Sequence, residues 1–230
     1  MQIHRTSSKK RARAAALFTA VLALAGCKAD FSASADYAEL FQVRPSMKLA
    51  TLAIEVPSCY EQNTDFESSA VLELKARIPI VLPQARYLGC RAEDFTASAV
   101  FSTPVKIGRL SAPCTGADIC IGAEGTSDAS VVAAAGPDFL SGLEKVEAAS
   151  VLSFEPSVTL DLSMNAGRDV EIIAPSLFIN DEPHHFSQLV LEDDTSVTMT
   201  LSDAATATFF QGEATVIFLR VKELPREERL

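Results

Sequence analysis

The feature that most limits the fold of this chain is an alternation of apolar and polar residues in its carboxyl half. Within 151–164, Val158, Leu160 and Leu162 alternate with polar residues, as expected for a strand with one buried face. The same signal returns in 169–180, 186–193, 195–202 and 213–221. The carboxyl half is therefore predicted to consist almost entirely of strands.

A helix is predicted between the first strands of the amino half. Thr64 and Glu67 match a capping box, and apolar residues then recur at helical spacing, which predicts a helix over 65–77. Pro79 and Pro83 are expected to end it, because proline interrupts helical hydrogen bonding. Strand-like segments lie on both sides of this helix and further along the chain, at 47–56, 85–92, 96–108 and 129–135.

Together these elements predict an α+β fold with a mostly antiparallel sheet, two or three short helices and a strand-rich carboxyl half. The remaining helices are expected over 138–149 and 203–210. The segment 110–128 is expected to be a loop, because Gly, Ser and Ala dominate it. Residues 47–230 are predicted to form the folded domain, with room for two subdomains at 47–128 and 129–230.

The first 26 residues have the layout of a secretory signal. Residues 1–13 contain five basic side chains and no acidic one, and residues 14–26, AAALFTAVLALAG, are all small or apolar. This apolar run is shorter than the roughly 20 residues that a membrane-spanning helix needs. Removal of residues 1–26 during export is therefore preferred over a permanent transmembrane helix.

The signal ends in Leu24-Ala25-Gly26-Cys27, which resembles the lipobox of bacterial lipoproteins. In that family the cysteine thiol receives a diacylglyceryl group, the signal is cut just before the cysteine, and the new amino terminus is usually acylated. The resemblance implies that Cys27 is the first residue of the mature chain and its point of attachment to a membrane. The alternatives are an ordinary secretory signal with a chance cysteine, or a Cys27 that joins a disulfide.

Several acyl chains would hold the mature protein at a membrane of the cell envelope, because each buried methylene contributes about 0.8 kcal/mol. Lys28 follows the cysteine, where many enteric bacteria place aspartate to retain a lipoprotein at the inner membrane. The resemblance therefore favours the outer membrane if the host is Gram-negative. Residues 27–46 are small and polar, and they are predicted to form a tether between the lipid and the folded part.

Four further cysteines suggest two disulfides, because an even number in an exported chain is typical of a disulfide framework. Cys59, Cys90, Cys114 and Cys120 allow three connectivities. Pairing Cys59 with Cys90 and Cys114 with Cys120 is favoured, because each pair then encloses a self-contained segment. Each bond is expected to contribute roughly 2–4 kcal/mol through loop closure. A zinc site is less favoured, because no CxxC spacing occurs and the histidines lie far along the chain.

The charge of the chain excludes some classes of partner. Its formal charge is −10, and loss of the basic signal makes the mature chain more acidic. An acidic surface repels phosphate backbones and anionic lipid headgroups, which argues against nucleic-acid binding. The protein is therefore expected to contact the membrane through its lipid and not through a basic surface patch.

No catalytic set emerges from the sequence, and no cofactor is expected. The motifs GxSxG and HExxH are absent. Outside the signal, histidine-dependent chemistry rests on His184 and His185, in a segment interpreted as an acidic loop between strands. A metal-binding or hydrolytic protein centred on these two histidines, with Asp181 or Glu182, is kept as an alternative. The acidic segment 191–196 is interpreted as a charged hairpin turn.

Protein binding leaves weaker traces in the sequence. Thirteen phenylalanines, three tyrosines and no tryptophan argue against a carbohydrate platform. Strands rich in Thr and Ser, such as 195–202, can serve as edges to which another protein adds a strand, although they are more often ordinary outer faces of a sheet.

A second and more diffuse resemblance covers residues 27–108. Cys27, KADF, a strand ending in PSC, a helix, LGC and ASAVFSTPVKIG are similar to small lipoproteins encoded in phages and prophages. This resemblance implies a non-enzymatic envelope protein, such as one that masks a receptor from a second phage. The sequence thus leads to the hypothesis of a lipid-anchored, disulfide-stabilised protein that binds an envelope protein. Its role is then either to exclude a second phage or to take part in envelope assembly. A small-molecule-binding lipoprotein is a further alternative.

Overall fold

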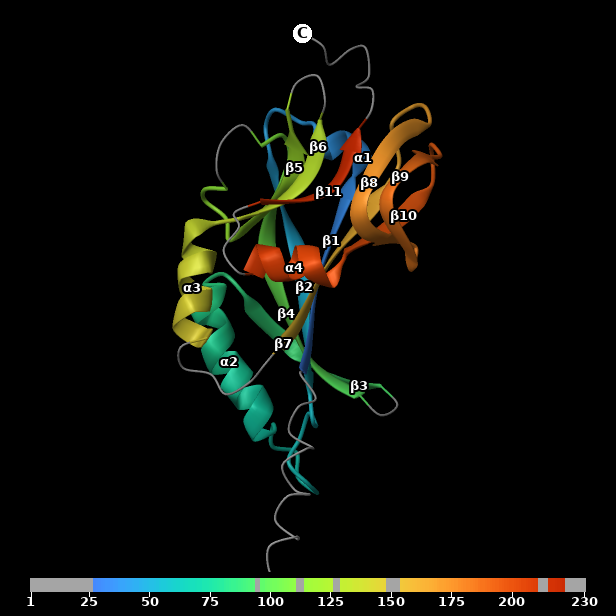
Figure 1. The fold of residues 1–230 in the computed structure, drawn as a ribbon. Coiled ribbons are helices and arrows are strands. Elements are labelled where there is room, and N and C mark those ends of the chain that lie inside the picture. Colours follow the sequence, from blue (N-terminus) through green and yellow to red (C-terminus); the bar gives the residue numbers. More distant parts are fainter. Residues whose placement is uncertain are drawn as a thin grey trace, which may run out of the picture.

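The computed structural model describes residues 27–93, 96–110, 114–125, 129–147, 154–210 and 215–221. The described part consists mainly of strands (Figure 1). These are β1 (Cys27–Asp36), β2 (Ser46–Val56), β3 (Arg86–Glu93), β4 (Thr96–Ile107), β5 (Ile119–Glu124), β6 (Ser130–Ala135), β7 (Phe154–Ser163), β8 (Val170–Ile179), β9 (Glu182–Leu191), β10 (Ser196–Leu201) and β11 (Thr215–Val221). The helices are α1 (Tyr37–Leu40), α2 (Ser69–Val81), α3 (Pro137–Glu147) and α4 (Asp203–Phe210). Each described helix is too short or too polar to cross a membrane.

Nine of the strands close into a barrel, which overturns the predicted α+β fold with a mostly antiparallel sheet. The hydrogen-bonded order is β7, β1, β2, β4, β5, β6, β11, β8 and β10, and β10 pairs again with β7. Strands from 47–128 and from 129–230 belong to this one ring, joined where β5 pairs with β6. Alternation in a sequence identifies strands, but it does not show which strands pair over long separations, and closure depends on those pairs.

The first strand closes the ring by pairing in parallel with β7. Every residue of β1, from Cys27 to Asp36, has a partner in β7. Phe31, Ala33 and Ala35 are buried, so one face of β1 contributes to the core. The first part of 27–46 is therefore a wall strand and not the predicted tether. Because most of its side chains are small, β1 lacks the alternation of large apolar and polar residues that identifies a strand in a sequence.

Two strands, β4 and β8, each pair with two different strands along one edge. One edge of β4 pairs with β2, while its other edge pairs with β3 over 96–102 and with β5 over 105–107. In the same way, β8 carries β9 on one edge and both β11 and β10 on the other. We call the part with β3, α2 and α3 the Cys27 end, and the part with α1, β5 and β6 the α1 end (Figure 1).

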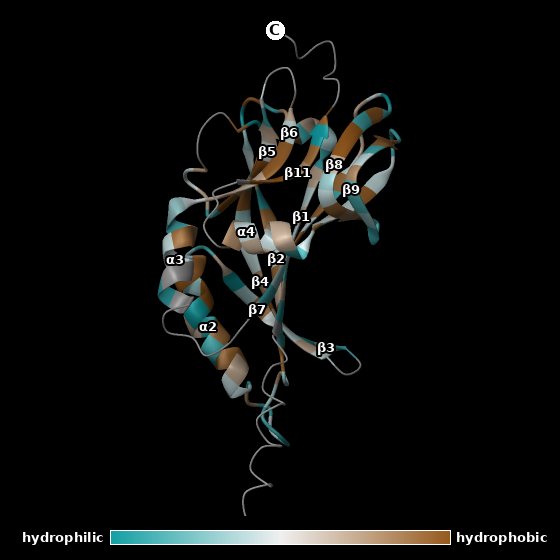
Figure 2. Ribbon diagram, viewed as in Figure 1, coloured by the Kyte–Doolittle hydropathy of each residue, from teal (hydrophilic) through white to brown (hydrophobic). Residues whose placement is uncertain are grey.

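Apolar side chains fill the barrel and continue under the helices. Tyr37, Phe101, Phe209 and Phe218 are among the largest fully buried side chains, and apolar residues dominate β5, β6 and β11 (Figure 2). The backbones of β5 and of the segment after β4 also approach each other closely. A Cβ atom on Gly122 of β5 would lie 1.6 Å from the carbonyl oxygen of Gly108, which follows β4, so only glycine fits this approach.

Helix α2 begins later than predicted and runs through Pro79. Ser68 Oγ accepts a hydrogen bond from the Val71 N–H at 3.4 Å, whereas the Thr64 hydroxyl donates to the Glu61 carbonyl within the preceding loop. Ser68 is buried and Thr64 is exposed, so the cap forms where the helix meets the core. Pro79 has no N–H to donate to the carbonyl four residues earlier, but it lies in the last turn, so one hydrogen bond is lost and the helix ends two residues later, at Val81.

Both of the favoured disulfides are present in the structure. Cys59–Cys90 joins the loop after β2 to β3, and Cys114–Cys120 pins the segment before β5 onto that strand. β5 itself lies within 110–128, which the sequence analysis wrongly predicted to be a loop. Its residues from Ile119 to Ala123 are all buried, so β5 lacks the alternation by which half-buried strands are recognised.

Candidate functional site

The outward face of the sheet carries a row of hydroxyl side chains that crosses five strands. Thr51 of β2 pairs with Ser102 of β4 and with Ser32 of β1. Ser32 pairs with Thr159 of β7, and Thr159 pairs with Thr200 of β10. The hydroxyl oxygens of this last pair lie 3.0 Å apart. Neighbouring strands are ~4.8 Å apart, so this hydroxyl row is roughly 19 Å long.

The carboxylates nearest this row are held by further hydroxyl groups. The Ser157 hydroxyl donates to Asp30 Oδ1 at 2.6 Å on the Cys27 side of the row. On the other side, the Thr198 hydroxyl donates to Asp161 Oδ1 at 2.8 Å. The face is therefore polar and ordered by its own hydrogen bonds, and it offers both donors and acceptors to a partner.

Beside the hydroxyl row the face is hollowed into a shallow groove of ≈ 190 Å³. It is lined by Thr51, Ala53, Arg91, Glu93, Thr96, Ser98 and Val100. These residues belong to β2, β3 and β4, so the groove lies where the β3–β4 hairpin leaves the ring. An open groove with charged and hydroxyl side chains suits segments of a protein better than an enclosed small molecule.

Next to this groove, β3 presents a free strand edge. Among the described residues β3 is hydrogen-bonded to β4 alone. The register shifts between Tyr87 and Gly89, and the pairing is regular from there to Glu93. A free edge offers backbone N–H and C=O groups to an added strand.

A cluster at the base of α2 holds β3 in place. Lys75 Nζ lies 2.6 Å from Glu67 Oε2 and 4.8 Å from the centre of the Tyr87 ring. The hydrogen bond from Lys75 lowers the pKa of Glu67. Burial, together with a hydrogen bond to Glu67, raises the pKa of Tyr87 to about 12. These contacts and the Cys59–Cys90 bond attach β3 to α2 and to the loop before it.

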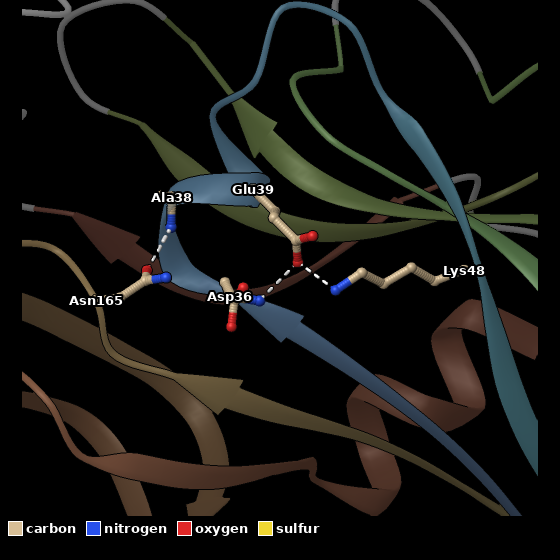
Figure 3. Close-up of polar contacts among 5 residues, drawn as sticks. All are labelled: Asp36, Ala38, Glu39, Lys48 and Asn165. Atoms are coloured by element: carbon tan, nitrogen blue, oxygen red, sulfur yellow. Dashed lines mark hydrogen bonds and ion pairs between the residues drawn. The ribbon is translucent and has the colours of Figure 1, made fainter.

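At the α1 end, a second polar cluster fixes β1 (Figure 3). Glu39 Oε2 accepts a hydrogen bond from the Asp36 N–H at 2.8 Å and pairs with Lys48. The Ala38 N–H donates to Asn165 Oδ1 at 3.0 Å. Burial opposes ionisation of Glu39, but the Asp36 N–H and Lys48 outweigh it and lower its pKa. These contacts tie β1 to β2 and to the β7–β8 connection.

Cys27 lies at the opposite end of β1, at the edge of the described chain. Ala29 pairs with Ile54, so the antiparallel register brings Cys27 level with Val56, the last residue of β2. Cys27 therefore lies at the end of the sheet where β2 passes into the loop before α2. The predicted signal, residues 1–26, lies outside the described residues.

The two histidines lie within β9 and not in the acidic loop that the sequence analysis expected. Asn180 and Asp181 have φ angles of 49° and 68°, the conformation of a two-residue hairpin turn, so β9 begins directly after them. His184 and His185 are adjacent on the strand and point to opposite faces. Among the described residues, no three His, Cys, Asp or Glu side chains are grouped as a metal site requires.

The acidic segment 191–196 connects β9 to β10, but it is not the predicted hairpin turn, because among the described residues β9 pairs with β8 and β10 pairs with β7 and β8. Asp193 Oδ1 accepts a hydrogen bond from the Gly167 N–H at 3.0 Å. Asp169 Oδ1 accepts one from the Asp193 N–H, also at 3.0 Å. The carboxylates therefore brace this turn against the β7–β8 connection.

Sequence reasoning missed the hydroxyl row because its members come from five strands. The Thr- and Ser-rich segment 195–202 drew attention to β10, which supplies Thr200. The other members are single polar residues between buried neighbours, which every half-buried strand has. Only the register of the pairs places them in one line.

Comparison with known proteins places the chain in a family. No curated protein and no solved structure matches it. A family match covers residues 38–223, from α1 to just beyond β11, and leaves out β1. By this match, the chain belongs to the family described as a domain of unknown function, DUF7424.

Proposed function

We propose that this chain is a lipid-anchored protein of a bacterial cell envelope that binds another protein and catalyses no reaction. Cys27 is its attachment point, and the hydroxyl row, the groove and the free edge of β3 are its binding surface. The observation that supports binding most strongly is the free edge of β3 beside a polar groove. The lipobox supports the anchor.

An extended segment of a partner adds to the free edge of β3 through backbone hydrogen bonds. Its side chains then reach the groove, where Thr51 and Ser98 supply hydroxyl groups and Arg91 and Glu93 supply one charge of each sign. Charges beside an added strand select between partners more than they strengthen binding. Reversing those charges should therefore change which partner binds.

Two biological roles belong to this function. The resemblance to lipoproteins of phages and prophages favours exclusion, in which the protein covers an outer-membrane receptor. Expression should then reduce plating of the phages that use that receptor, and unchanged plating across a broad panel argues against this role. In the second role, envelope assembly, deletion should cause envelope defects instead.

Site-specific photo-crosslinking in intact cells tests the binding surface. A photoreactive amino acid in place of Ser98 lies in the groove, and one in place of Val190, which is exposed on β9, is the matched control. We expect a crosslink to one envelope protein from position 98 and none from position 190. Arg91→Glu should abolish that crosslink while leaving the protein folded. Equal crosslinking at both positions, or no effect of Arg91→Glu, would contradict the proposed surface.

A further inference from the structure

The loop between β2 and α2 exposes two aromatic side chains to solvent. Tyr60 is 54% exposed and Phe66 is 78% exposed. An exposed phenylalanine in a structured loop costs solvation free energy unless a partner or a membrane covers it. Tyrosine combines an apolar ring with a polar hydroxyl, which suits the boundary between lipid and water.

The backbone of this loop is closed by hydrogen bonds and a disulfide. The Glu61 N–H donates to the Phe66 carbonyl and the Ser68 N–H donates to the Cys59 carbonyl, both at 2.9 Å. Cys59 is bonded to Cys90 of β3. These bonds therefore hold the backbone that carries Tyr60 and Phe66 in a defined conformation.

This loop and Cys27 lie at the same end of the molecule. The loop begins directly after Val56, which the register places level with Cys27. The start of β1 and this loop both lie toward the lower end in Figure 1. Because β1 begins at Cys27 itself, no spacer separates the folded part from a lipid on that residue. A lipid at Cys27 would thus bring the loop to the membrane surface.

We propose that Tyr60 and Phe66 enter the interfacial layer of the bilayer beside the lipid on Cys27. This inference rests on the proposed anchor and adds a fixed orientation to it. The loop also carries Glu61 and Asp65, both exposed, and an acidic loop is repelled by anionic headgroups. Its lipid surface is therefore zwitterionic, and the free edge of β3 is held close to the membrane.

The absence of tryptophan from the chain allows a direct test. Phe66→Trp introduces a single reporter in the loop, and Phe186→Trp places one on β9, where Phe186 is 69% exposed. Each protein is reconstituted into phosphatidylcholine vesicles whose acyl chains are brominated. We expect the emission of the Phe66→Trp protein to shift to shorter wavelength and to be quenched severalfold more than that of the Phe186→Trp protein.

Two measurements separate the absence of a lipid on Cys27 from a loop that does not enter the membrane. The mass of the amino-terminal peptide shows whether Cys27 carries lipid. If it does not, Cys27, the one cysteine outside the two disulfides, is coupled to a maleimide-bearing lipid and the same fluorescence is read. Equal quenching of the two proteins overturns the inference. A shift to shorter wavelength before vesicles are added also overturns it, because a second copy of the chain would then cover the loop.

Discussion

The ring of strands closes at the α1 end and stays open at the Cys27 end, while β9 lies outside the ring and pairs only with β8 among the described residues. At the α1 end, each strand of the ring has a bonded neighbour on both sides. At the Cys27 end, within the described residues, β3 is bonded only to β4 and the first half of β7 only to β1. Each end has its own disulfide and its own pair of lysine and glutamate.

The comparison shows which free edge of the Cys27 end suits a partner. Open edges invite pairing with other chains, and proteins often blunt them with proline. Pro156 lies in the open half of β7, where it has no N–H to donate. The free edge of β3 from Cys90 to Glu93 contains no proline. The open end therefore has one blunted edge and one edge suited to binding.

The largest expected difference between the ends comes from their leucines. Leu160 of β7 is 0% exposed inside the ring, and Leu88 of β3 is 61% exposed. Leu160→Ala should cost up to about 5 kcal/mol of unfolding free energy, because it leaves a cavity. Leu88→Ala should change it by less than about 0.5 kcal/mol. Urea unfolding of both variants measures this, and similar losses would contradict the packing described.

Removing the two disulfides should also affect the ends unequally. Cys59 and Cys90 are 31 residues apart, and Cys114 and Cys120 are 6 apart. Loop-closure entropy then predicts a loss of about 3–4 kcal/mol for Cys59→Ala with Cys90→Ala, and about 2 kcal/mol for the other pair. Denaturant unfolding under oxidising conditions compares the two double variants. A larger loss for the variant without Cys114–Cys120 would contradict the order that loop length predicts.

The lysine–glutamate pair at the α1 end should give a smaller effect that depends on pH. Lys48→Met should cost about 0.5 kcal/mol near neutral pH, as a partly exposed ion pair does. Because the pKa of Glu39 is lowered below its usual 4.5, this contribution is present above that value and is lost as pH falls through the lowered pKa. Lys106→Met is the control, since Lys106 donates to the Thr115 carbonyl and its effect should not change over that range.

The smallest effect near neutral pH concerns Tyr87 at the Cys27 end, because this side chain titrates only at high pH. Its pKa is raised to about 12 from 10.0, so the folded state holds its proton more tightly and stability should fall as pH rises between these values. Glu67→Gln removes the carboxylate and should move the pKa of Tyr87 part of the way back, because burial remains. Ultraviolet absorbance of tyrosinate measures the titration. An unchanged midpoint would contradict the contact between Glu67 and Tyr87.

Local sequence signals located most elements but not the architecture. The alternation around Leu160 and Leu162 is a property of one strand, so β7, β8 and β10 could be predicted from it. β1 and β5 could not, because the first has mostly small side chains and the second is buried throughout. The start of α2 was wrong because Thr64 and Ser68 are both good caps, and burial of Ser68 decides between them.

The proposed binding surface was even harder to predict, because its residues come together only through pairing of strands that lie far apart in the sequence. Ser32 and Thr159 lie side by side only because β1 and β7 pair in parallel, and no local pattern predicts that pair. The disulfides were predictable, because each joins cysteines that enclose one compact segment. The proposal of an anchor at Cys27 comes from the residues before it, but the position of Cys27 at the open end of the sheet required the register.

The amino-terminal peptide of the protein, isolated from the membranes of producing cells and analysed by mass spectrometry, tests the central claim most directly. We expect a peptide that starts at Cys27, lacks residues 1–26, and carries the mass of a diacylglyceryl group and an added acyl chain. A peptide that still contains leader residues, or a Cys27 with an unmodified thiol, would contradict it.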